Sequence, residues 1–136
     1  MCYVANVGDS RCIMSVDGGR KVFALSQDHK PNDDQEQERI QQNGGKIYQT
    51  QTTVPTADGL GTQNILGPHR VFPGRLSVSR TFGDIEAKLP KYGGNPAVIV
   101  ATPEIRMFKI ESHFDFILLA CKPPPLSAQA TASSTK

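Results

Sequence analysis

Short apolar runs separated by turn sequences organise the first part of the chain. Residues 1–26 contain three such runs, divided by GDSR and DGGR, and this pattern predicts a three-stranded meander. In the first turn Gly8 tolerates a positive φ, and the side chain of Asp9 can bond to nearby backbone N–H groups. Asp17, followed by two glycines between apolar runs, predicts a hairpin.

A polar helix is predicted next. Asn32 is the expected N-cap, with Gln35 at the capping-box position and acidic residues suited to the positive end of the helix dipole. Gly44 and Gly45 are expected to end the helix. Ile40 is its only strongly apolar residue, so we expect most of the helix surface to face water.

The middle of the chain has little periodicity. Residues 46–51 are consistent with a short strand, whereas residues 51–73 are rich in Thr, Gly, Pro and Asn and predict a long loop that is either functional or a flexible insertion. Order returns at GRLSVSRTFGD, where Leu76, Val78 and Phe82 are the candidates for burial.

The last apolar run indicates a strand of the protein interior. AVIVATPEIRMFKI predicts one or two strands, the second after Pro103, and ESH predicts a turn. In FDFILLAC both alternating sets of side chains are largely apolar, which predicts a strand covered on both faces. The following KPPPLSAQATASSTK, residues 122–136, is a low-complexity segment that we expect to be disordered.

Composition narrows the function classes. The 136 residues suffice for one domain, and 38% hydrophobic residues predict a modest core. A net charge of +2 gives no electrostatic case for binding nucleic acid or an anionic membrane. The longest apolar run is too short to cross a bilayer, and no signal peptide follows Met1. We therefore expect an intracellular, cytoplasmic protein.

The metal-binding residue types are scattered. An odd number of cysteines (Cys2, Cys12 and Cys121) favours reduced thiols, and no Cys or His pair has metal-ligand spacing. The three histidines are interpreted as surface or turn side chains. Asp9 is the one candidate, because a carboxylate on a tight turn between strands is held rigidly, as sites for hard cations require. Turn formation alone is the alternative explanation.

Six ordered motifs connect these features to a known family. They are VANVGDSR, LSQDHKP, ERIQQNGG, GRLSVSRTFGD, ATPEI and DFILLAC. Together they resemble the PPM-type (type 2C) metal-dependent protein serine/threonine phosphatases over residues 2–121. The resemblance implies an α+β fold, a partial antiparallel β-sandwich flanked by helices and incomplete at both ends. It divides the chain into a partial phosphatase domain (residues 1–121), with a flap-like region at about residues 46–95, and the tail.

The resemblance also implies a chemistry. Family members use two Mg²⁺ or Mn²⁺ ions to hydrolyse phosphoserine and phosphothreonine in phosphoprotein substrates. Asp9 matches an aspartate associated with a further, weaker metal position. Arg80 and Asp84 match positions with mainly structural roles, and a contact with phosphate is the alternative for Arg80. No residue of this chain is assigned a catalytic role.

Departures from the family pattern limit what the chain is expected to do alone. The upstream D-G-H-G-G motif and the later D-N motif have no counterpart, and Lys122 stands where a metal-bridging aspartate is expected. We therefore expect a phosphatase fragment that is inactive alone. There are two alternatives. The chain could be a non-catalytic binding or regulatory fragment that retains the flap, or a non-functional truncated product. Missing strand partners predict a marginally stable chain, monomeric or prone to aggregation.

Overall fold

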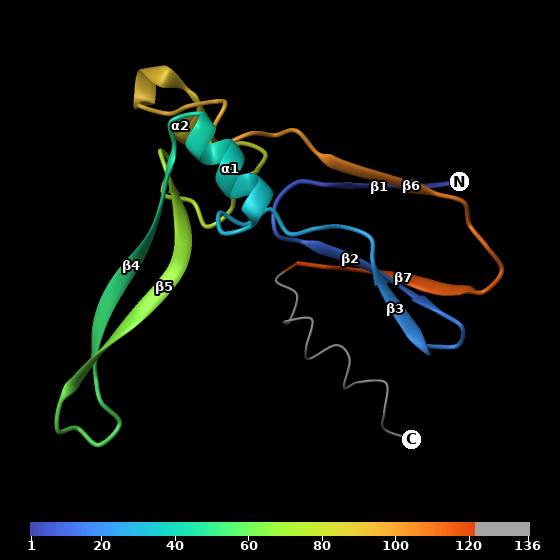
Figure 1. The fold of residues 1–136 in the computed structure, drawn as a ribbon, viewed down its shortest axis with the longest axis horizontal. Helices are drawn as coiled ribbons and strands as arrows, with labels where there is room; N and C mark the ends of the chain where they lie inside the picture. The colour runs from blue at the N-terminus through green and yellow to red at the C-terminus, as the bar shows by residue number, and fades with distance from the viewer. Residues whose placement is uncertain (122–136) are drawn as a thin grey trace. The chain divides into compact units, whose positions relative to one another are not determined.

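The computed structural model describes residues 1–121, which form two compact units (Figure 1). Unit 1 consists of Met1–Asp28 together with the chain from Thr102 onward, and unit 2 is His29–Ala101. The predicted disordered tail and Lys122 lie outside the described residues. Among residues 1–121, no helix has the length and apolar character needed to span a membrane.

Unit 1 contains two antiparallel sheets. In the first, β1 (Cys2–Asn6) pairs with β6 (Glu104–Phe108). In the second, β2 (Arg11–Val16) lies between β3 (Lys21–Ala24) and β7 (Phe114–Ala120). Strands from the two ends of the described chain therefore build both sheets.

The three strands predicted for residues 1–26 are present, but the predicted meander is wrong. β1 pairs with β6, and the turn after it carries the chain into the other sheet, where β2 begins. Consecutive strands thus bury their apolar side chains by facing one another across two layers rather than by pairing. The hairpin between β2 and β3 is confirmed, with Asp17 at φ 57° followed by two glycines with positive φ.

The core of unit 1 lies between the two sheets. Its buried members come from β2 and from the residue after β3, and the side chains packed against them come from β1, β6 and β7. These residues are Cys12, Met14, Val16 and Leu25, with Val4, Phe108 and Phe114 against them. The rings of Phe108 and Phe114 meet edge to face at 5.9 Å between centroids. This arrangement is the expected partial β-sandwich.

The prediction that the last strand is covered on both faces is wrong for the described chain. In β7, Phe116 is 60% exposed and Leu119 is 75% exposed, and the two residues between them are also exposed. Within residues 1–121, β7 pairs only with β2, and both alternating sets of its side chains include exposed residues. Both faces of the strand are therefore apolar, but the described residues leave most of each face exposed.

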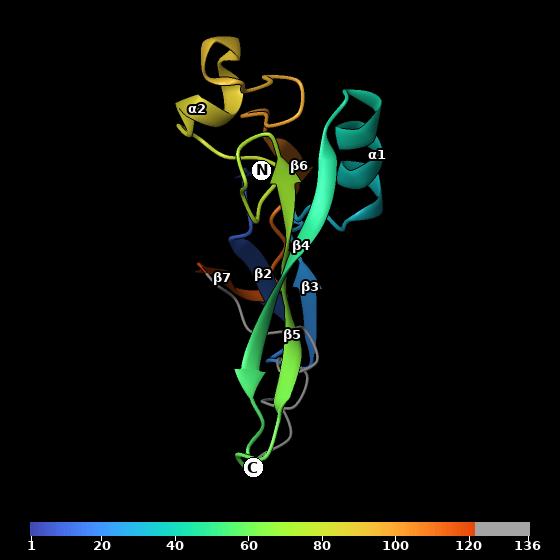
Figure 2. The ribbon, with the colours of Figure 1, turned by 90° about the vertical axis from the view of Figure 1, so that its left-hand side faces the viewer.

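Unit 2 contains the helices and a long hairpin. Its α-helices are α1 (Asp34–Gln42) and α2 (Ile85–Lys88), and the short 3-10 helix η1 (Pro90–Tyr92) follows α2. The strands β4 (Lys46–Pro55) and β5 (Thr62–Phe72) pair with each other as a twisted ribbon (Figure 2).

The loop predicted for residues 51–73 is wrong, because most of it is paired as β4 and β5. The strand predicted at residues 46–51 is present and continues to Pro55. Thr50 to Leu66 contains almost only exposed side chains, on both faces of the ribbon, so the alternation that identifies a half-buried strand is missing. Only the base of the hairpin is anchored, by the fully buried Val71.

The helix prediction is correct except at the start, where the N-cap and the capping-box position are each one residue later than predicted, so Glu36 rather than Gln35 holds the second. Asp33, not Asn32, is the N-cap of α1, and its carboxylate accepts hydrogen bonds from the backbone N–H groups of Gln35 and Glu36. Ile40, the only strongly apolar residue of the helix, is fully buried in the core of unit 2. The other members of that core are Val71, Ala87, Val98 and Ile99, with Ile47 and Leu76 packed against them.

Two further burial and strand predictions differ from the structure. Phe82 is 74% exposed rather than buried, whereas Leu76 packs on the core as expected and Val78 is half-buried. Val98 and Ile99 are fully buried without belonging to a strand, and the residue after them forms only an isolated bridge with Arg80. The apolar residues of this run are therefore explained by burial in the core of unit 2 and not by a strand.

Candidate functional site

The turn that carries Asp9 joins the two sheets of unit 1. Gly8 has φ 105°, which an L side chain rarely adopts, and it is buried, so the turn requires glycine at this position. Asp9 follows at once and is half-buried. The conformation of the turn thus fixes the backbone position from which the Asp9 side chain extends.

Asn6 supports the turn from the end of β1. Its buried side-chain amide donates to the carbonyl oxygens of Gly8, at 3.2 Å, and Gln27, at 2.8 Å. The backbone N–H of Gln27 in turn donates to the Glu104 carboxylate at 3.0 Å. Three separate segments of unit 1 are therefore linked beside Asp9.

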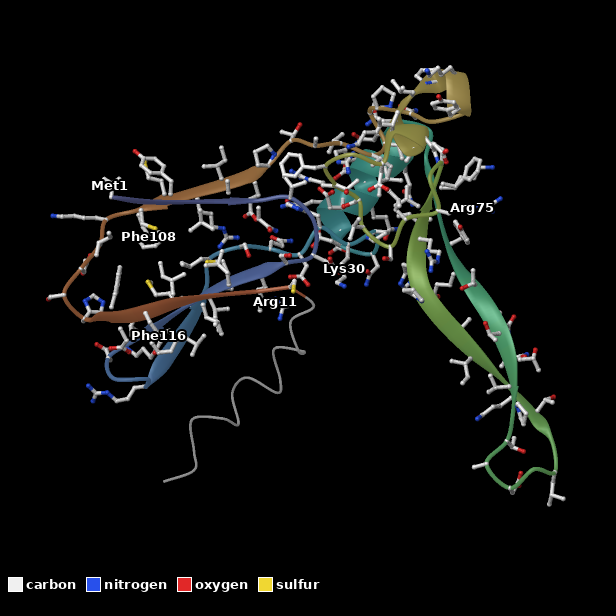
Figure 3. The ribbon with its side chains drawn as sticks, turned by 180° about the vertical axis from the view of Figure 1, so that it is seen from behind. Met1, Arg11, Lys30, Arg75, Phe108 and Phe116 are labelled. Carbon is white, nitrogen blue, oxygen red and sulfur yellow. The ribbon has the colours of Figure 1, made fainter. Side chains whose placement is uncertain are left out.

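Arg11 supports the turn from the start of β2 (Figure 3). Its guanidinium forms a bidentate pair with Asp28, with Nε–Oδ1 3.0 Å and Nη2–Oδ2 2.9 Å. The two side chains are only 14% and 13% exposed. Such a fork-shaped pair fixes geometry as well as charge, so the turn is held from both sides.

The described residues do not complete a metal site around Asp9. No group of three or more His, Cys, Asp or Glu side chains among residues 1–121 is placed to hold a metal ion. The nearby acids already have partners, since Asp28 binds Arg11 and Glu104 binds Gln27. The assignment of Asp9 as a metal ligand stays a prediction, because residues 1–121 form no group that could hold an ion by itself.

A second polar cluster, the Glu36 cluster, lies in unit 2 and was not predicted from the sequence. Glu36 is 3% exposed and accepts hydrogen bonds from the side chains of Arg39 and Arg80, at 2.9 Å and 2.5 Å at their closest. The hydroxyl of Ser79, itself fully buried, donates to the same carboxylate. Glu36 is the third residue after the N-cap, a position where an acid usually turns back to the cap, so the pattern gave no reason to expect it inside.

The environment of Glu36 keeps it ionised. Burial by itself raises the pKa of this carboxyl, but hydrogen bonds from Arg80, Arg39 and Ser79 outweigh burial and lower the pKa to about 2. Arg39 also donates to the backbone carbonyls of Ala97 and Val98, at 2.9 and 2.8 Å. The Glu36 cluster therefore fastens α1 to two loops of unit 2, which is a structural role.

Arg80 and Asp84 each make contacts within unit 2 that support its structure. Arg80 pairs with Glu36 rather than with Asp84. Asp84 adopts a left-handed backbone conformation at the start of α2, and its carboxylate accepts a hydrogen bond from the Thr81 hydroxyl at 2.8 Å. The two residues thus act at different places.

The cysteines and histidines do not gather into a site. All three cysteines are free. His69 lies in β5. His113 lies in the turn before β7, which agrees with its interpretation as a surface or turn side chain. His29 is 4% exposed, so its interpretation as a surface residue is wrong. Its backbone carbonyl accepts a hydrogen bond from the N–H of Ser79 at 3.0 Å, which ties it to the Glu36 cluster.

Known proteins resemble this chain over nearly all the described residues. The sequence model of the family described as "Protein phosphatase 2C" matches residues 2–123. A Paramecium tetraurelia protein named "Probable protein phosphatase 2C 5" is 35% identical over 120 residues, which are 88% of this chain and 33% of the relative. An Arabidopsis thaliana protein named "Probable protein phosphatase 2C 17" is 37% identical over 87% of this chain and 33% of the relative.

A solved structure gives the same result for the fold. The crystal structure of a phosphatase from a pathogenic strain of Toxoplasma gondii aligns with a TM-score of 0.59 and 32% identity, over 88% of this chain and 30% of that chain. The chain thus spans about a third of the length of the relatives it matches. The antiparallel sheets, the order of the motifs and these similarities agree, and we conclude that the chain belongs to the protein phosphatase 2C family.

Proposed function

We propose that this chain is part of the catalytic domain of a protein serine/threonine phosphatase, which hydrolyses phosphoserine and phosphothreonine in protein substrates. The observation that carries the proposal is the family match over residues 2–123, which includes the Asp9 turn. Because the chain spans about a third of its relatives, the activity is proposed for a whole domain that contains such a segment.

Asp9 is the proposed metal ligand of this chain. Family membership implies Mg²⁺ or Mn²⁺, hard cations that prefer oxygen ligands such as carboxylates. Asn6 and the Arg11–Asp28 pair support the assignment, because they hold the turn so that Asp9 needs little reorganisation to bind an ion. The other ligands would have to come from residues beyond those described, so the 136-residue chain by itself is proposed to be inactive.

Two further assignments belong to this proposal. Residues 46–95 are proposed as the flap-like region beside the catalytic cleft of the whole domain, and the β4–β5 hairpin is their main element. An intracellular, cytoplasmic location is proposed because the cysteines are unpaired, as expected in a reducing compartment.

The test is a chimera that restores the rest of a domain. Residues 2–121 replace the matching segment of the Paramecium relative, and phosphate release from a phosphothreonine peptide is measured against Mn²⁺ concentration. We expect Mn²⁺-dependent turnover by the chimera and background release by the 136-residue chain. A chimera that unfolds cooperatively but releases no phosphate would contradict the proposed function.

The role of Asp9 needs its own comparison. In the same chimera, Asp9→Asn keeps the size of the side chain and removes its charge, so a higher Mn²⁺ concentration should be required for half-maximal turnover. Asp34→Asn, at an exposed position in the first turn of α1, is the matched control and should leave the Mn²⁺ dependence unchanged. Equal Mn²⁺ dependence for both variants would contradict a metal role for Asp9.

A further inference from the structure

An open pocket lies at the base of the β4–β5 hairpin, and its volume is about 760 Å³. Strand register explains its composition, because Lys46 is opposite Phe72 and Tyr48 is opposite Arg70, so each pair shares a face of the ribbon. Arg75 follows the hairpin and lies at its base (Figure 3). The full lining is Lys46, Ile47, Tyr48, Thr50, Arg70, Phe72 and Arg75.

The charged residues of this pocket are all cations. It contains Lys46, Arg70 and Arg75, and no carboxylate lines it. None of the ion pairs found among residues 1–121 uses any of the three. Arg70 donates one hydrogen bond, from Nη1 to the backbone carbonyl of Arg75 at 2.8 Å, which holds its guanidinium in place. Three neighbouring cations without a carboxylate partner attract a negatively charged ligand.

The remaining lining favours a ligand with apolar groups as well. Phe72 is 52% exposed and Tyr48 is half-buried, so both rings offer apolar surface beside the cations. Aromatic side chains and arginine are the residue types that contribute most to protein recognition. A simple inorganic anion would leave this apolar surface unused.

The outer edge of β4 beside the pocket is also available for pairing. Among residues 1–121, β4 pairs only with β5, whereas the outer edge of β5 is occupied at the pocket, where the Val71 N–H donates to the Leu76 carbonyl at 2.8 Å. An extended peptide can add to such an edge through main-chain hydrogen bonds while alternate side chains enter the neighbouring pocket.

We propose that the base of the β4–β5 hairpin binds an acidic, extended peptide segment of a partner protein. Acidic side chains of the peptide pair with Lys46, Arg70 and Arg75, and its apolar side chains lie on Tyr48 and Phe72. This surface lies in unit 2 and uses no residue of the Asp9 turn. It belongs to the region proposed as the flap, but peptide binding is measured without phosphate release, so failure of one proposal is distinguishable from failure of the other.

The experiment is a binding titration with the 136-residue chain. A fluorescein-labelled peptide that repeats Glu-Leu-Glu-Phe is followed by fluorescence anisotropy, beside a peptide that repeats Lys-Leu-Lys-Phe. The acidic peptide should bind and the basic peptide should not, and added salt should weaken the binding because it screens the charges. Equal binding of both peptides would overturn the proposal.

Charge reversal locates the site. The double variant Lys46→Glu, Arg75→Glu should weaken binding of the acidic peptide about tenfold or more, because two attractive pairs become repulsive. The control Lys91→Glu, Lys109→Glu reverses two exposed lysines outside the pocket and should leave the affinity within about twofold. Equal losses in the two variants would overturn the assignment to this pocket.

Two further arms exclude other ligands and other causes. Inorganic phosphate should not displace the peptide at equal concentration, and an oligothymidylate should bind less tightly than the acidic peptide. Displacement by phosphate or tighter binding of the oligonucleotide would overturn the peptide assignment. Should the reversed variant fail to fold, Lys46→Gln with Arg75→Gln removes the charges without repulsion and should still weaken binding severalfold. Unchanged affinity in that folded variant would overturn the proposal.

Discussion

Arg80 and Glu36 form a close ion pair in unit 2, with Nη2 of Arg80 2.5 Å from Oε1 of Glu36. The arginine Nε lies 3.1 Å from both carboxylate oxygens. Glu36 comes from α1, whereas Arg80 comes from the loop after the β4–β5 hairpin. α1 buries only one apolar side chain, Ile40. The Arg80–Glu36 pair therefore adds a charged contact that attaches this mostly polar helix to the rest of unit 2.

Removing the charge of Glu36 should destabilise the chain. In Glu36→Gln, Arg80 and Arg39 lose a shared carboxylate, and we expect the free energy of unfolding to fall by about 2–3 kcal/mol. Urea unfolding followed by circular dichroism measures this loss. Glu38→Gln is the control, because Glu38 is exposed on the same helix and should change stability by less than about 0.5 kcal/mol. Equal midpoints for the two variants would contradict the structural role of the Glu36 cluster.

The same carboxylate predicts a pH dependence. The pKa of Glu36 is lowered from 4.5 to about 2 in the folded chain, so its contribution is fully present above the unfolded pKa and is lost as pH falls through the folded pKa. The difference in urea midpoint between the original chain and Glu36→Gln should therefore be largest near neutral pH and shrink toward about pH 2. A difference that stays constant over this range would count against the assigned charge state.

Much of the α1 region could be predicted, and the part that could not has a physical explanation. Cap residues, Ile40 and the glycines locate the helix to within one residue at its start. The inward position of Glu36 depends on Ser79 and Arg80, which are more than 40 residues away and leave no trace in the local pattern. Which distant residue a side chain contacts is decided by the tertiary structure, so it cannot be predicted from the local sequence pattern.

The turn before β2 predicts a measurable coupling. Arg11→Ala, Asp28→Ala and the double variant form a double-mutant cycle, and we expect a coupling free energy of about 1–2 kcal/mol because the pair is bidentate and mostly buried. Lys21 and Asp17 form the control pair, at 3.7 Å with the lysine side chain 67% exposed. Their coupling should be below about 0.5 kcal/mol. Similar coupling in both pairs would show that the Asp9 turn has no special support.

The exposed strand β7 predicts self-association. Phe116 and Leu119 expose apolar surface on an edge strand, a combination that favours pairing with another chain. Light scattering should show mass rising with concentration, and Phe116→Lys with Leu119→Lys should suppress the rise. Leu60→Lys, at a position 90% exposed between β4 and β5, is the control and should not suppress it. A chain that stays monomeric at every concentration would refute this expectation.

Strands were easier to predict than their partners. FDFILLAC and the runs of residues 1–26 have the composition of strands, and all of them are strands. Their pairing could not be read locally, because β1 and β2 both bury apolar side chains whether they pair or face one another. The hairpin of β4 and β5 was missed for another reason, since side chains exposed on both faces carry no alternation.

The account is tested most directly by one assay of Mn²⁺-dependent phosphate release from a phosphothreonine peptide. The 136-residue chain and the chimera that carries residues 2–121 within the Paramecium relative are measured side by side. We predict background release by the chain, because its described residues hold no metal cluster, and Mn²⁺-dependent turnover by the chimera. Turnover by the chain alone, or a folded chimera without turnover, would contradict the account.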